Sequence, residues 1–195
     1  MINDALASLN DAEQLSANLA ALANHENFAI RALPAGEFLG TYVQRLQDRG
    51  EARWTVRLDS PDHLPAVVAD ARYLELALNA VVKNASEAIG DAVVGEIVLR
   101  VRVERGVQQM LHIVIADSGG GLKLRAPARP FEIGVSSKSR HSHVGIGLWF
   151  ARQVMRAFGG GAQIVEAGLA GRSFVQLSLP CVTGEQQSLP IIASQ

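Results

Sequence analysis

The sequence predicts an α/β sandwich in which helices cover one face of a mixed sheet. Apolar residues recur at helical spacing in several segments, and other segments alternate apolar and polar residues as half-buried strands do. Because the helical and alternating segments are interleaved along the chain, a sheet with a helical layer is the simplest arrangement that buries all of them. The chain has 195 residues, 48% of them hydrophobic, which is enough to form a sizeable core.

The N-terminal part is predicted to be a separate helical segment. Residues 3–28 carry a leucine stripe that includes Leu15, Leu19 and Leu22, and a stripe this narrow needs a partner helix to cover it. The sequence 34–36 interrupts the pattern, and a second helix carries apolar residues from Phe38 to Leu46. We therefore divide the chain into a helical segment at 1–32, a globular domain at 33–181 and a flexible tail at 182–195.

The globular domain continues with a half-buried strand at 54–58 and a proline-containing loop. A long helix is predicted from Ala71 to Ile89, where Gly90 and Asp91 stop it. The remaining elements are predicted as strands at 97–103 and 111–115, a loop over 118–144, a helix at 148–158 closed by glycines, and strands at 162–166 and 172–179. A loop of that length inside a compact domain is usually functional or disordered.

Composition restricts the class of protein. The formal net charge of −1 gives no basic excess that would point to nucleic acid. Cys181 is the single cysteine, so the chain holds neither a disulfide framework nor a thiolate metal cluster, which suits the cytoplasm. No apolar run approaches the roughly 20 residues that span a bilayer, although a parent protein could carry such an anchor elsewhere.

Three motifs and one basic residue are candidates for a ligand site. Asn84 lies among small and aliphatic residues of the long helix, where its carboxamide oxygen could bind Mg²⁺ or simply be satisfied by backbone. Asp117 ends a strand before a glycine run that includes Gly119 and Gly121, so its carboxylate could accept a hydrogen bond from an exocyclic amine; an ordinary turn is the alternative.

The third motif opens the last helix. Gly145, Gly147 and Leu148 stand where helix N-terminal amides bind phosphate, although a lone Gly-x-Gly is weak evidence. Lys138, in the loop before this motif, could reach a triphosphate, whereas the other basic residues of the loop are expected to be solvated.

Taken together, the motifs resemble those of the ATPase superfamily of gyrase, the large heat-shock chaperones, mismatch-repair ATPases and histidine kinases. The likeness covers about residues 35 to 180 and is closest to the histidine kinases. It rests on segments that resemble the asparagine box, the first glycine box, the phenylalanine box with its lid, and the second glycine box: residues 84–88, 117–121, 131–138 and 145–148.

The resemblance implies the Bergerat-type two-layer sandwich and the phosphoryl-transferring domain of a two-component sensor kinase. Asp117 would bind adenine with Gly119 and Gly121, Asn84 would hold Mg²⁺, and Lys138, Gly145, Gly147 and Leu148 would surround the ATP phosphates. The γ-phosphoryl group would pass to a histidine on a dimerisation domain and then to a response regulator, and the parent protein would be a homodimer.

The sequence departs from the family pattern in two places. His25 resembles the start of an acceptor motif but lacks the proline that follows it, so we do not expect the acceptor histidine within this chain. Ala80 stands where many relatives have an asparagine and the hydrolytic ones a glutamate, and Asn79 is about 140° around the helix from Asn84. Glu87 is then the only candidate base, and a hydrolytic or non-catalytic nucleotide-binding module of the same superfamily is the alternative function.

Overall fold

A computed structural model describes residues 28–49, 54–90, 95–119, 130–132, 146–167 and 172–182. The elements follow in the order β1 Arg31–Pro34, α2 Ala35–Asp48, β2 Trp54–Asp59, β3 Ala66–Ala69, α3 Ala71–Ile89, β4 Gly95–Glu104, β5 Met110–Asp117, α4 Gly147–Ala157, β6 Gly161–Ala167 and β7 Arg172–Pro180. The predicted helix at 3–28 lies outside the described residues except for Phe28, as does nearly all of the predicted loop and tail.

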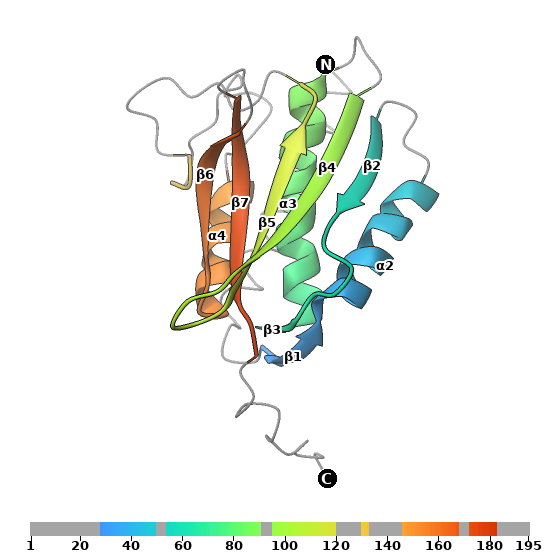
Figure 1. Ribbon diagram of the computed structural model, residues 1–195. Helices are drawn as coiled ribbons and strands as arrows, with labels where there is room; N and C mark the ends of the chain where they lie inside the picture. The colour runs from blue at the N-terminus through green and yellow to red at the C-terminus, as the bar shows by residue number, and fades with distance from the viewer. Residues whose placement is uncertain are drawn as a thin grey trace.

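The main sheet has five strands in the order β2-β4-β5-β7-β6. β2 runs parallel to β4 and the other neighbours are antiparallel, so the sheet is mixed as predicted. Figure 1 shows α3 and α4 behind this sheet and α2 beside them, which leaves the opposite face of the sheet without a helix layer among the described elements. The prediction of a two-layer α/β sandwich is therefore confirmed.

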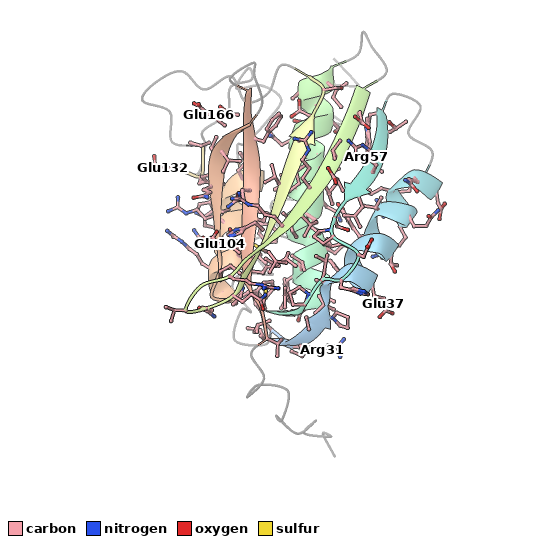
Figure 2. All side chains as sticks on the ribbon, viewed as in Figure 1. Arg31, Glu37, Arg57, Glu104, Glu132 and Glu166 are labelled. Atoms are coloured by element: carbon pink, nitrogen blue, oxygen red, sulfur yellow. The ribbon has the colours of Figure 1, made fainter. Side chains whose placement is uncertain are left out.

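The core lies between the sheet and the helices because each strand directs alternate side chains toward the helical layer. Ile97, Leu99, Leu111 and Ile113 are at most 1% exposed and pack against buried residues of α3 and α4. Figure 2 shows side chains filling this space, while the labelled charged residues, all of them exposed, lie on the outside. Among the described helices, none combines the length and the apolar character needed to cross a membrane.

Two short strands, β1 and β3, were not predicted. They pair antiparallel with Arg31 opposite Ala69, in a small sheet separate from the main one. Each strand has four residues, which is too short for a period of two to be recognised, and β1 ends at the proline that we interpreted as a break.

The start of the described chain is tied to the helices by Asp70 and Phe28. Asp70 caps α3 by accepting hydrogen bonds from the Arg72 and Tyr73 amides, and it also accepts one from the Ala29 amide at 2.8 Å. The Phe28 ring stacks on Tyr73 with 4.0 Å between the ring centroids. The segment that leads into the domain is thus fixed at the N-terminal end of α3.

Candidate nucleotide site

One stripe of α3 brings the two glycine motifs and the asparagine together. Ala80, Asn84 and Ala88 are four residues apart, so they lie on the same face of the helix at intervals of about 6 Å along its axis. Ala80 is next to the start of α4, and Ala88 is next to the turn after β5. Asn84, which is partly buried, is therefore placed between the two glycine motifs.

The turn after β5 packs closely on the end of α3. A β-carbon on Gly119 would overlap the carbonyl oxygen of Ala88 and would lie 2.7 Å from the Ile89 nitrogen. Glycine is therefore needed here for a close approach between two backbones. The contact holds the end of β5 near the end of α3 (Figure 1), and Asp117 is the last residue of β5.

Asp117 continues the alternation that directs Ile113 and Ile115 toward the helices, so its side chain lies on the helical side of the sheet. It is opposite Ile97 in the register with β4. The residue is partly buried, and its Oδ1 atom is buried. A carboxylate in this position can select a ligand that brings a hydrogen-bond donor, as the amino group of adenine does.

The second glycine motif begins α4 beside Ala80. A β-carbon on Gly147 would lie 3.7 Å from both the β-carbon and the carbonyl oxygen of Ala80, which is ordinary van der Waals contact. No side chain of the described residues caps α4 at its N-cap, Ile146, and its first turn contains no acidic residue. Among the described residues, therefore, no side chain competes with an anion for the amides of this turn, and no carboxylate in the turn would repel it.

Asn79 faces away from the stripe, as predicted. The Tyr42 hydroxyl, on α2, donates a hydrogen bond to the Asn79 Oδ1 atom at 3.0 Å. Tyr42 is 1% exposed, and its pKa is raised above the ordinary value. The main cause is burial, and the nearby Glu75 carboxylate is the second cause. Asn79 therefore links α2 to α3, and its side-chain oxygen is turned toward α2 and not toward the Asn84 face of the helix.

The middle of the long loop is anchored to the domain through Phe131. This residue is 9% exposed and belongs to the core, and the guanidinium of Arg152 lies over its ring, 5.7 Å from the centroid. Residues 130–132 form a turn with no helix or strand, which agrees with the prediction of a loop, and the other predicted loop residues between 120 and 144 lie outside the described ones.

Among the predicted site residues, Gly119 and Gly147 pack on α3 at positions on either side of Asn84. Asp117 is two residues before Gly119, and Leu148 directly follows Gly147. Leu148 is partly buried and packs against the core. Glu87 is partly buried on α3, one turn beyond Asn84. Lys138, Gly121 and Gly145 lie outside the described residues.

Sequence reasoning missed what Ala88, Ser118 and Arg152 do. The signal for Ala88 was available, because it is two helical turns from Ala80 on the face of Asn84. Nothing local in the sequence indicated the Ser118 and Arg152 contacts, which join residues that are distant along the chain.

A magnesium ion fits this donor set. Among the described residues, no three His, Cys, Asp or Glu side chains gather into a metal-binding cluster. Mg²⁺ is commonly bound by one or two protein oxygens together with substrate phosphates and water, so one carboxamide beside the phosphate-binding end of α4 satisfies the protein's part.

Comparison with known proteins supports a nucleotide site. Residues 69–183 match the sequence profile of the family described as histidine kinase-, DNA gyrase B-, and HSP90-like ATPase. The match covers more than half of the chain and spans the described motifs from α3 to β7.

The chain is 30% identical over 143 residues to the sensor histidine kinase DcuS of Escherichia coli strain K12, a match that covers 72% of this chain. It spans only 25% of the length of that relative. Among solved structures, a mycobacterial sensor histidine kinase, MprB, aligns with a TM-score of 0.61 at 20% identity, covering 78% of this chain and 98% of that one. Full-length ShkA, in complex with AMPPNP, aligns with a TM-score of 0.63 at 19% identity, covering 91% of this chain and 36% of that one.

Proposed function

This chain belongs to the family of histidine kinase-, DNA gyrase B- and HSP90-like ATPases, and we propose that it transfers the γ-phosphoryl group of ATP to a histidine of a separate dimerisation domain. Its ATP-binding domain is of the sensor histidine kinase type, as its relatives and its fold indicate. The observation that carries the proposal is the α3 stripe, which places Asn84 between a carboxylate suited to adenine and a helix N-terminus suited to phosphate.

In this proposal Asp117 accepts a hydrogen bond from the adenine amino group, and Gly119 and Gly121 let the base approach the backbone. The first amides of α4 bind the phosphates, which can come close because Gly145 and Gly147 have no side chains. Leu148 holds that turn against the core. Lys138 neutralises phosphate charge. Asn84 would hold Mg²⁺, which when bound offsets charge on the phosphate oxygens.

The chain's own contribution to phosphoryl transfer is positioning and charge stabilisation. In this proposal the adenine is bound at one end of the stripe and the phosphates at the other, which would hold the γ-phosphoryl group at a defined place. The described residues place no acid–base pair at the phosphate end, and the transfer requires none when the acceptor imidazole is itself the nucleophile.

The acceptor is proposed to lie outside this chain. His112 is 8% exposed, and its ring nitrogens are hydrogen-bonded to Glu104 and Ser178 at 2.9 and 2.8 Å. Both nitrogens of this imidazole therefore already have partners within the sheet. His63 lies in an exposed loop before β3. His25, His141 and His143 lie outside the described residues. A phosphoacceptor hairpin, a response regulator and a homodimeric parent remain predictions.

The test is transfer of label from γ-labelled ATP to a separately supplied acceptor hairpin. We expect acid-labile label on the hairpin and none on the chain itself. Asp117→Asn should weaken ATP binding much more than binding of inorganic triphosphate, because only the adenine contact is altered. Equal losses for both ligands would exclude the adenine role of Asp117.

A hydrolase is the second candidate, and Ala80 argues against it. Ala80 lies one turn before Asn84, on the same face and next to Gly147, where a carboxylate would point toward the phosphates. General-base assistance typically contributes about 10²- to 10⁴-fold, so ATP hydrolysis without an acceptor should be very slow.

Phosphate release from the wild-type chain distinguishes the two candidates. Ala80→Glu should raise release above that of Ala80→Gln, which has a similar size but cannot accept a proton. Turnover near one per second in the wild type, abolished by Glu87→Gln, would favour a hydrolase with a relocated base.

A further inference from the structure

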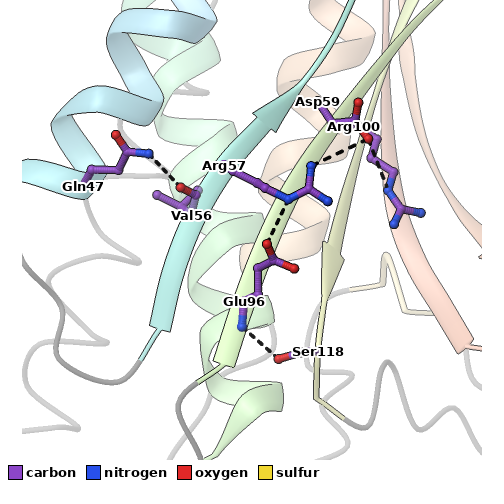
Figure 3. Close-up of polar contacts among 7 residues, drawn as sticks. All are labelled: Gln47, Val56, Arg57, Asp59, Glu96, Arg100 and Ser118. Atoms are coloured by element: carbon purple, nitrogen blue, oxygen red, sulfur yellow. Dashed lines mark hydrogen bonds and ion pairs between the residues drawn. The ribbon is translucent and has the colours of Figure 1, made fainter.

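Ser118 joins the turn that carries Asp117 to the beginning of β4. The Ser118 amide donates a hydrogen bond to the Glu96 carbonyl oxygen at 2.9 Å. In return, the Glu96 amide donates to the Ser118 hydroxyl oxygen, also at 2.9 Å (Figure 3). The two residues thus exchange two hydrogen bonds directly beyond the last paired residues of the ladder, Ile97 and Asp117.

In the second of these bonds, a side chain accepts where a backbone group usually does. A hydrogen-bonded pair in an antiparallel ladder exchanges two backbone N–H···O=C bonds. Here the Ser118 hydroxyl accepts from the Glu96 amide. The bond across the strands is therefore kept while the chain turns out of the sheet, and β5 ends at Asp117.

The other side of the turn is held by α3. The contact between Gly119 and the Ala88 backbone leaves no space for a β-carbon. Asp117 is followed by Ser118, which is hydrogen-bonded to β4, and then by Gly119, which is packed on α3. The direction of its carboxylate is therefore determined from both layers of the fold.

We propose that Ser118 is a positioning residue for adenine recognition, a role that rests on the proposed function of Asp117. Its hydroxyl holds the end of β5 on β4, so that the Asp117 carboxylate stays on the helical side of the sheet. Ser118 itself is exposed and its hydroxyl is turned toward the Glu96 amide, so its effect on adenine would be exerted through the position of Asp117.

The neighbouring ion pair supplies a matched control. The Glu96 carboxylate pairs with the Arg57 Nε atom at 2.8 Å, and the two side chains are 48% and 49% exposed (Figure 3). Exposed ion pairs of this kind contribute little. Glu96→Gln removes this charge and keeps the backbone amide that bonds Ser118, so it separates the hydroxyl bond from the surface charge.

The experiment measures dissociation constants of the purified chain for ATP and for inorganic triphosphate by calorimetry, both with Mg²⁺. Ser118→Ala should weaken ATP binding about threefold to tenfold, the range that corresponds to one hydrogen bond, and leave triphosphate binding unchanged. Ser118→Thr retains the hydroxyl and should restore ATP binding, and Glu96→Gln should match the wild type.

Exchange of the Glu96 amide with solvent gives a second measurement that does not depend on nucleotide. It should accelerate in Ser118→Ala and stay slow in Ser118→Thr, because only the former loses the acceptor. An unchanged exchange rate, an unchanged ratio of ATP to triphosphate affinity, or equal loss of both ligands in Ser118→Ala would overturn the positioning role. If Asp117→Asn showed no loss specific to ATP, the proposed adenine site would fail as well. If Asp117→Asn weakened ATP binding and Ser118→Ala did not, the proposed role of Ser118 would be excluded and that of Asp117 would stand.

Discussion

Gly119 and Gly147 are both glycines of the nucleotide motifs, but their surroundings predict different effects of an added methyl group on thermal stability. In Gly119→Ala the β-carbon would lie 2.5 Å from the Ala88 carbonyl carbon and 2.7 Å from the Ile89 nitrogen. Ordinary contacts of this type exceed about 3.4 Å, so the backbones must separate by about 1 Å. Neither neighbouring group is a side chain that could rotate away.

The expected destabilisation of Gly119→Ala follows from this overlap. Overpacking in a fixed environment costs typically about 1–3 kcal/mol, and a clash between two backbones belongs at the upper end. For a domain of this size, about 3 kcal/mol corresponds to a fall in Tm of roughly 6–12 °C. ATP binding should fall too, because separating the turn from α3 moves Asp117.

Gly147→Ala should behave differently. Its β-carbon would lie 3.7 Å from Ala80, and as the first residue of α4 it has a backbone conformation that alanine adopts readily. The Tm should therefore stay close to that of the wild type. ATP affinity should nevertheless fall, because the methyl group would stand at the phosphate-binding turn.

The assay is thermal unfolding followed by circular dichroism, combined with ATP titration of each variant. If Gly119→Ala had the Tm of the wild type, the turn would not be packed on α3. If Gly147→Ala lowered Tm as much as Gly119→Ala, the two contacts would be equally tight, in contradiction to the predicted difference.

Three further predictions concern the scaffold. The pKa of Tyr42 is raised in the folded state, so the folded chain keeps the Tyr42 proton above about pH 10, where the unfolded chain loses it. The free energy of unfolding should therefore be constant in this respect below about pH 10 and should fall as the pH rises above about 10. Urea unfolding between pH 9 and 11 measures this fall, which should be smaller in Tyr42→Phe. Asp70→Ala should lower the free energy of unfolding by about 1–2 kcal/mol, because α3 loses its N-cap; Asp70→Asn, which retains a capping oxygen, should lose less, and equal losses would contradict the capping role. Cys181 is 1% exposed and burial raises its pKa, so a thiol reagent should modify it slowly in the native chain and rapidly in urea, and rapid native labelling would contradict the buried position.

Local patterns in the sequence were sufficient to predict the long helices and their ends. The helix predicted from Ala71 to Ile89 has those bounds in the structure, because its apolar spacing continues until a glycine. The last helix was predicted one residue late and runs from Gly147 to Ala157. Its glycine stop is confirmed by Gly159, which has a φ of 78°, a conformation that glycine adopts without strain.

Contacts between distant segments were beyond local signals. β1 and β3 each have four residues and are separated by α2 and β2, so neither predicts the other. The nucleotide motifs were recognised because each has a local signature, but their meeting on one stripe of α3 depends on tertiary packing. The roles of the predicted site residues remain predictions, and those of Lys138, Gly121 and Gly145 concern residues outside the described structure.

The stripe also gives a physical reason for the departure at Ala80. Gly147 and Gly119 contact α3 at Ala80 and at Ala88, so each glycine motif packs on a small residue of the helix that carries Asn84. A larger residue at 80 would lie beside the first turn of α4, the proposed phosphate-binding turn. Ala80 therefore leaves the start of α4 in ordinary contact with α3 and places no base beside the proposed phosphate site. The lack of a base at 80 suits the proposed transfer of the γ-phosphoryl group to an acceptor and not to water.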